Sequence, residues 1–221
     1  MKPLLGAGAF LFACSLSATA LAQSSDADWD GDYRNAKDRR RAHFMAGLGV
    51  GLHVGSAQGY PNEAEKIGKP EFVTETGTAL GPGGTAWLGI AMSDWLSAGL
   101  GAASTQLGSE RVKAQSTLFL CRVETYPLFG AGGLWRDVGI GGSFGLGLLT
   151  LEEDGAEKAD AGAASLIAGS VFFEAFRSAG LALGPMVELS HMWSYSANQT
   201  AGLFGVRLAF YSAGGREADG E

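Results

Sequence analysis

Bulky apolar residues and small residues alternate along most of this chain, and this alternation limits the folds available to it. In residues 44–55, FMAGLGVGLHVG, the even positions carry six apolar side chains, whereas four of the six odd positions are glycine. A period of two is typical of a β-strand, because successive side chains point to opposite faces of the strand. The pattern therefore predicts strands with one apolar face and one nearly bare face.

Residues 137–151, DVGIGGSFGLGLLTL, repeat the contrast, with glycine or serine at every second position from Gly139 to Gly147. Glycine weakens an ordinary strand because it costs backbone entropy and offers no side chain to pack. The chain nevertheless has 35 glycines in 221 residues, well above the usual share of about 7%. We expect the bare face to line a narrow lumen, where glycine leaves room for large side chains from other strands, and the apolar face to meet lipid.

Eight strands are predicted from this alternation, over residues 42–56, 79–92, 95–107, 113–126, 135–150, 161–175, 180–193 and 200–212. The connections are short at 93–95, 127–134 and 175–178, and more polar or longer at 57–78, 108–112, 152–160 and 194–199. Short turns at one end and longer loops at the other are typical of an outer-membrane barrel. The predicted fold is an all-β, eight-stranded, antiparallel up-and-down transmembrane β-barrel.

The segments outside the predicted barrel are a signal peptide and two tails. Lys2, an apolar stretch and the Ala20-Leu21-Ala22 sequence predict a cleaved signal peptide. A lipoprotein cut at Cys14 is the weaker alternative, because the bulky Phe12 does not suit that pattern. The predicted division is a signal peptide at 1–22, a flexible charged periplasmic tail at 23–41, the barrel at 42–212 and a C-terminal tail at 213–221.

Charged side chains also fall on the predicted lumen face. Arg122, Glu124, Glu188 and Arg207 give two charges of each sign, and His53 joins them by its place in the alternation. A single buried charge is costly, so opposite charges are expected to pair. We expect a polar interior network that links the walls and closes the pore; a path for protons or ions is the alternative interpretation.

Aromatic residues gather near the predicted strand ends, where rings with an apolar body and a polar edge suit a membrane interface. Those expected near the short-turn end are Trp95, Tyr126, Trp135, Phe176 and Tyr211, and those near the loop end are Tyr60, Trp193 and Tyr195. The face occupied by Trp87 is left open by the pattern.

Two segments carry residue types used by hydrolases. Ser143 lies in GGSFG, a match to G-x-S-x-G, but strand alternation follows it instead of a helix. His191 and Ser194 lie in ELSHMWSYSAN, which resembles the His-x-Ser-Asn segment of PagL-type lipid A deacylases. The serine spacing differs, and residues 200–212 contain no acidic residue to orient the histidine. Both are therefore expected to be structural, with His191 and Ser194 kept as a weaker catalytic hypothesis.

Three aspartates before the barrel match the start of a calcium loop. Asp26, Asp28 and Asp30 precede Gly31, but Lys37 stands where an EF-hand carries its bidentate glutamate. A solvated acidic linker is therefore expected more than a metal site, and no cofactor is predicted. The formal net charge of −7 favours no nucleic-acid partner.

Over 42–212, the strand spacing and alternation resemble the small outer-membrane barrel superfamily of the OmpA, OmpX and OmpW type. That resemblance implies a location in the bacterial outer membrane, insertion by the barrel assembly machinery and contact with outer-membrane lipids. The role we expect first is a non-enzymatic one, in membrane integrity or in contacts made by loops, with the loop partner unknown. A lipid A deacylase-like enzyme and a small transporter of apolar molecules are the alternatives.

Overall fold

The computed structural model describes residues 41, 43–131, 133–178 and 180–212. The predicted signal peptide, the predicted tail as far as residue 40 and the C-terminal tail lie outside the described residues. The same is true of the calcium-loop aspartates Asp26, Asp28 and Asp30.

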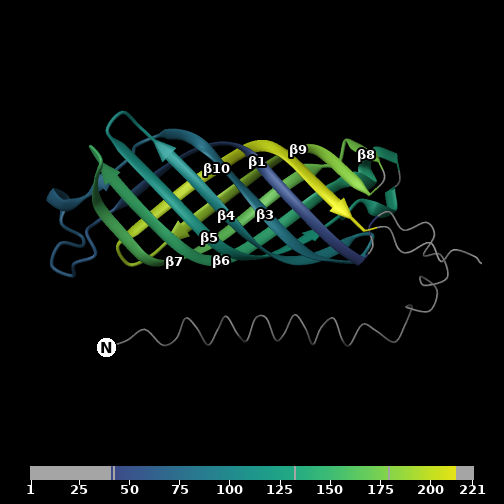
Figure 1. The fold of residues 1–221 in the computed structure, drawn as a ribbon, viewed down its shortest axis with the longest axis horizontal. Helices are drawn as coiled ribbons and strands as arrows, with labels where there is room; N and C mark the ends of the chain where they lie inside the picture. Colours follow the sequence, from purple (N-terminus) through teal and green to yellow (C-terminus); the bar gives the residue numbers. More distant parts are fainter. Residues whose placement is uncertain (1–40, 42, 132, 179, 213–221) are drawn as a thin grey trace, which may run out of the picture. The chain divides into compact units, whose positions relative to one another are not determined.

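Eight long antiparallel strands form the molecule (Figure 1). They are β1 (His43–Gly59), β3 (Ala79–Ser93), β4 (Leu96–Gly108), β5 (Val112–Thr125), β6 (Val138–Glu153), β7 (Ala156–Phe173), β9 (Leu181–Trp193) and β10 (Ala197–Tyr211). The shorter elements are β2 (Thr74–Glu75), β8 (Phe176–Ser178) and the 3-10 turns η2 (Pro70–Phe72), η3 (Phe129–Ala131) and η4 (Gly133–Asp137). Among the described residues, no helix is long and apolar enough to cross a membrane.

The long strands pair in chain order, and the last strand returns to the first. β10 pairs with β9 on one side and with β1 on the other, in a register that runs from Met45 opposite Tyr211 to Gly59 opposite Ala197. The eight long strands therefore close into a barrel. The predicted eight-stranded up-and-down fold is confirmed. We call the end that carries residues 60–78 the loop end, and the end that carries Arg41 and Ser212 the terminal end.

The connections differ from the prediction. Residues 152–160 were expected to form a loop, but β6 and β7 continue through them to a two-residue turn at Asp154 and Gly155. The φ angles of these two residues are 52° and 79°, as a tight hairpin turn with two left-handed positions requires. The charges in this stretch therefore mark solvated strands that extend the hairpin. At the loop end, only residues 60–78 form a long connection.

The outer surface carries a continuous series of exposed apolar side chains, which is the sidedness that the alternation predicts. Phe119 is 78% exposed and Leu100 is 68% exposed. Other exposed members of this apolar belt are Leu48, Val50, Leu52, Leu88, Ile90, Leu146, Leu148, Ile167, Val171, Val187, Leu189, Phe204, Val206 and Leu208. The belt extends over all eight long strands.

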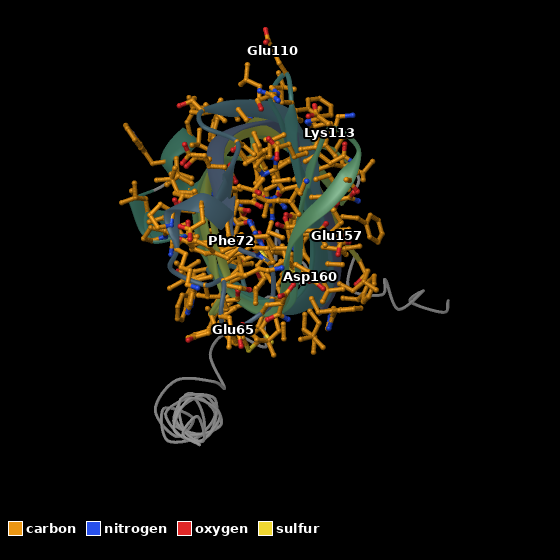
Figure 2. All side chains as sticks on the ribbon, turned by 90° about the vertical axis from the view of Figure 1, so that its left-hand side faces the viewer. Glu65, Phe72, Glu110, Lys113, Glu157 and Asp160 are labelled. Atoms are coloured by element: carbon orange, nitrogen blue, oxygen red, sulfur yellow. The ribbon has the colours of Figure 1, made fainter. Side chains whose placement is uncertain are left out.

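The lumen is filled with side chains, and Figure 2, which looks at the barrel from the loop end, shows them across the centre of the ring. The half nearer the loop end is an apolar cluster, with buried Leu107, Leu118, Leu149, Leu151 and Met192 among its members. The prediction of a polar lumen is therefore wrong for this half. Inward positions on β4, β5 and β6 change from glycine or charged residues to leucine toward the loop end. The total number of glycines does not show this change, because it carries no information on their positions along the strands.

Inward-facing glycines lie beneath large rings, as the bare strand faces predict, but the rings come from neighbouring strands. A Cβ atom added to Gly47 would lie 2.1 Å from the ring of Trp87, its pairing partner on β3. A Cβ atom added to Gly139 would lie 2.2 Å from Phe172, its partner on β7. Trp87, whose face was left open, points inward and is 3% exposed.

Candidate functional site

The half of the lumen nearer the terminal end contains a network of buried ion pairs. Arg122 and Glu124 lie two residues apart on β5, so the strand period directs both inward. Arg207 on β10 and Glu188 on β9 face the same space. Among the sequence-predicted lumen residues, these four are the ones that the structure brings together.

Arg122 connects four strands. Its Nε donates to Glu124 at 2.9 Å, and one terminal nitrogen donates to Glu188 at 2.9 Å and to Ser143 on β6 at 3.2 Å. The other terminal nitrogen donates to Ser170 on β7 at 3.0 Å. The guanidinium lies 4.6 Å from the centre of the Trp87 ring. Four of the five N–H donors of this arginine are used in these hydrogen bonds, so the charge is buried with partners on several walls.

Arg207 extends the network toward the terminal end. It donates to Glu124 at 2.7 Å and, through its other terminal nitrogen, to Glu174 at 2.9 Å. Its guanidinium lies 4.2 Å from the centre of the Phe172 ring. Glu124 therefore accepts from two arginines at once, which fixes β5 against β10 across the lumen.

Glu174 is the residue on which most of these contacts converge. Besides Arg207, it accepts from Arg41 at 2.7 Å, from the hydroxyl of Tyr126 at 2.8 Å and from that of Tyr211 at 2.6 Å. Arg177 donates to the same carboxylate. Glu174 itself is 3% exposed.

A β-bulge orders the wall around Glu174. Phe172 pairs with Met186 and Phe176 pairs with Leu183, so residues 173–175 face only residues 184–185 of β9. A bulge of this kind inserts one extra residue and reverses the alternation beyond it. Phe176 consequently faces outward, while Arg177 lies beside Glu174.

Arg41 closes the network at the terminal end. Its side chain is fully buried and donates to Asp137 of η4 at 2.9 Å as well as to Glu174. Its backbone N–H donates to the carboxylate of Asp94 at 2.8 Å, and its guanidinium lies 3.4 Å from the centre of the Tyr126 ring. The sequence placed Arg41 in a flexible tail. That assignment is wrong for this residue, because buried carboxylates provide it with partners that a tail lacks.

The two tyrosines predicted for the terminal-end aromatic belt also lie inside. Tyr126 and Tyr211 are 1% and 2% exposed, and their hydroxyls lie 2.8 Å apart. Both continue the inward alternation of Arg122 and Arg207, four residues earlier on the same strand path, and that signal could have located them. Trp95, Trp135 and Phe176 are exposed at this end, as predicted.

The electrostatics favour the charged forms of Glu174 and Arg41, which both lie outside the long strands. Burial alone would raise the pKa of Glu174, which lies between β7 and β8, but Arg41, Arg207 and Arg177 outweigh burial and lower it to about 2. Burial would lower the pKa of Arg41, but Tyr126, Glu174 and Tyr211 raise it above its ordinary value. In these ion pairs, Arg41, Arg122, Arg177 and Arg207 contact Glu124, Asp137, Glu174 and Glu188.

His53 faces the lumen but does not join these ion pairs. Its Nε2 lies 3.4 Å from the Thr105 hydroxyl, and its ring lies over Gly83. Its Nδ1 has no hydrogen-bond partner within the part of the chain that the structure describes. The alternation gives the face of His53 correctly. It does not give the height along the barrel, which depends on the stagger between strands.

Ser143, His191 and Ser194, the residues considered for a hydrolase, each have hydrogen-bond partners in the barrel wall or its turns. His191 points outward, hydrogen-bonds the Thr200 hydroxyl at 2.8 Å and stacks on Trp193. The Ser194 hydroxyl accepts from the backbone of Ser196 and Ala197 in the β9–β10 turn. Ser143 faces inward and accepts from Arg122.

The ionic network links side chains from opposite walls of the barrel. Each of its carboxylates, Glu124, Asp137, Glu174 and Glu188, forms an ion pair with at least one arginine. Within the described residues, no group of three or more His, Cys, Asp or Glu side chains is arranged to hold a metal ion.

Several solved structures are similar to this chain in fold. The attachment invasion locus protein Ail of Yersinia pestis has 8% identity and a TM-score of 0.47, covering 76% of this chain and 99% of that chain. Outer membrane protein OprG from Pseudomonas aeruginosa has 9% identity and a TM-score of 0.42, covering 79% and 100%. Neisserial surface protein A has 10% identity and a TM-score of 0.44, covering 76% and 97%. No protein-family model matches the chain, and no curated protein matches it.

Proposed function

We propose that this chain is a bacterial outer-membrane barrel with a closed lumen, which acts through its outer wall and its loops. The observation that carries the proposal is the apolar belt. Exposed leucine, valine, isoleucine and phenylalanine side chains encircle the barrel, whereas charged residues are paired inside. Water disfavours so large an apolar surface, and hydrocarbon chains favour it.

The orientation follows from the two ends. Barrels of this class have their longer loops outside the cell, and an even number of strands returns the chain to its starting side. The loop end, with residues 60–78, therefore faces outward, and the terminal end faces the periplasm. Barrel assembly machinery and membrane lipids are the partners that such a location requires.

The filled lumen supports a non-conducting role. Eight strands leave an interior that side chains can fill, and here leucines occupy one half and ion pairs the other. Stabilising the membrane and presenting the loop end to a partner are the remaining tasks. The 60–78 loop suits the second task because its ends are anchored: Tyr60 donates to Ser196, and Thr76 donates to Ala57.

Two measurements on the refolded chain test this proposal. We expect heat-modifiable gel mobility in detergent and stable insertion into lipid vesicles, because the belt needs an apolar environment. We also expect no stepwise current in planar bilayers, either for the native chain or for an Arg122→Met variant. A chain that stays soluble without detergent would contradict the membrane location, and large stepwise currents from the native chain would contradict the closed lumen.

The enzymatic alternative can be checked in cells that carry the gene and in cells that lack it. Lipid A mass spectra with and without the gene are expected to be identical, because His191 and Ser194 serve separate structural contacts. Release of a fatty acid from lipid A by the native chain, lost in a His191→Ala variant, would favour the hydrolase.

A further inference from the structure

A groove of about 360 Å³ lies on the wall of the barrel near the loop end. It spans β3 to β6, and its lining includes Leu80, Gln106, Lys113, Thr150 and Glu152. Figure 2 places Lys113 over the wall of the ring and not over its centre. The groove is therefore separate from the ionic network at the terminal end.

Two residues explain why the wall is hollowed here. Pro82 on β3 has no backbone N–H to donate, and the regular β3–β4 register has a gap between the Leu80–Gly108 pair and the Gly83–Thr105 pair. Gly108 has no side chain, and a Cβ added to it would meet only the Leu80 carbonyl oxygen, at 4.0 Å. The open space above Gly108 is thus free of backbone obstruction.

The groove ends at the wall. Its lining residues Leu107 and Ala114 belong to the apolar cluster of the lumen, and each is 1% exposed. A molecule in the groove therefore has packed leucine side chains behind it. This arrangement suits a ligand that stays on the outer surface, and it offers no opening into the interior.

The groove lies at the level where the outer wall changes from apolar to polar. On β5 the outward side chains pass from Phe119 through Thr117 to Gln115 and Lys113, and on β6 they pass from Leu148 to Thr150 and Glu152. With the apolar belt in the hydrocarbon, this level is the outer interface of the membrane. A ligand bound here has its polar part among these residues and its apolar part below them.

The two sides of the groove differ in chemistry. Leu80, which is 62% exposed, and Pro82 form an apolar side. The polar side has a lysine, two glutamines, a threonine and a glutamate, which together can bind an anion and both donate to and accept from hydroxyl groups. Lys113 stands opposite Glu152 in the β5–β6 register, but it forms no ion pair with Glu152 or with any other described residue.

We propose that this groove binds one membrane lipid of the outer leaflet, through a phosphorylated headgroup that also carries hydroxyl groups. Lys113 contacts the phosphate, Gln106, Gln115 and Glu152 contact hydroxyls, and an acyl chain lies along Leu80 and Pro82. The inference rests on the proposed membrane location, because only that location places an amphiphile at this level.

The experiment uses the full chain refolded in detergent, with diphosphoryl lipid A as the probe and phosphatidylcholine as the neutral comparison. Native mass spectrometry measures the fraction of barrels that retain one lipid. The test variants are Gly108→Phe, which fills the groove, and Lys113→Gln, which removes its cation. Their matched controls are Gly142→Phe, at an outward glycine with open space around it, and Lys158→Gln, at another exposed loop-end lysine.

We expect the native chain to retain lipid A in preference to phosphatidylcholine. Lys113→Gln should weaken retention about tenfold, the factor that the loss of one charge-assisted contact produces. Gly108→Phe should weaken retention by at least that factor, because its ring occupies the space of the ligand. The control variants should stay within about twofold of the native chain, as expected for exposed sites. Heat-modifiable mobility of every variant establishes that the barrel has folded.

Three results would overturn the inference: equal retention of both lipids by the native chain, retention by Gly108→Phe equal to that of Gly142→Phe, or equal losses in the two lysine variants. Each of these would leave the proposed membrane location intact if the native chain still inserts into vesicles. Failure of the native chain to insert would instead contradict the proposed function itself.

Discussion

The two halves of the lumen solve the same packing problem with different chemistry. Toward the loop end, leucines and alanines from several strands fill the space without polar groups. Toward the terminal end, arginines and carboxylates fill it with ion pairs that join opposite walls. An apolar interior depends on shape and volume, whereas an ionic interior depends on every charge retaining its partner.

This difference predicts how each half responds to a change. Leucine contacts act over a short range, so a substitution in the apolar half affects mainly its immediate neighbours. The charges converge on Glu174, which contacts residues from before β1, after β5 and near the end of β10. The terminal half therefore has one residue whose loss affects many walls, and the loop half has none.

The largest effect is expected for Glu174→Gln. This change leaves Arg41, Arg177 and Arg207 without their shared carboxylate, and breaking a buried ion pair from one side costs about 3–5 kcal/mol. Urea unfolding in lipid vesicles measures the loss. Glu157→Gln, on the exposed β6–β7 hairpin, is the matched control and should change the free energy of unfolding by less than about 0.5 kcal/mol. Equal effects of the two variants would show that Glu174 is not the centre of the network.

In the apolar half, Leu149→Ala should lower the free energy of unfolding by about 3 kcal/mol, because it leaves a cavity in a packed interior. Leu149 is fully buried, whereas its neighbour Leu148 points outward and is 59% exposed. Leu148→Ala should therefore cost less, since surrounding lipid chains can fill the space it leaves. A larger loss for Leu148→Ala in the same unfolding assay would reverse the sidedness of β6.

Acid should weaken the terminal half selectively. The folded-state pKa of Glu174 is about 2, against an ordinary value of 4.5, so its stabilising contribution is complete above pH 4.5 and is lost as the pH falls toward 2. Between pH 7 and pH 3 this group should account for a loss of about 2 kcal/mol. The measurement is the difference between the native chain and Glu174→Gln at both pH values. That difference should shrink at pH 3, and a constant difference would contradict the assignment.

Sequence reasoning predicted the fold well because strand alternation and closure are local or forced. The period of two identifies the faces of residues such as Phe119 and Arg122, and closing eight such strands into a barrel removes both edges of the sheet. It could also have placed Tyr126 inside, by extending the alternation past Glu124. It could not find the bulge after Phe172, because the extra residue is defined only by its pairing with β9.

The sequence also does not show which residues from different segments become neighbours when the barrel closes. Arg41 precedes the first strand and follows two arginines. The composition of this stretch is typical of a charged tail. Only the closure of the barrel brings Asp137 and Glu174 next to it. His53 was predicted to join the network but does not. It shares the inward face with the network residues but lies at another height along the barrel. Faces follow from the sequence period, whereas heights follow from the register.

The smallest effect concerns the glycines from which the alternation was first inferred. Gly47 lies beneath the Trp87 ring, so the Cβ of Gly47→Ala would require the ring to move, at a cost of about 1–2 kcal/mol. Gly142 faces outward with open space around it, and Gly142→Ala should be neutral or stabilise by about 0.5 kcal/mol through the unfolded chain. Urea unfolding measures the change in stability of each variant, and the tryptophan emission spectrum, to which Trp87 contributes, reports the movement of its ring. Equal changes in stability for Gly47→Ala and Gly142→Ala would contradict this interpretation. The inward glycines would then not be needed to make room for the rings that fill the terminal half of the lumen.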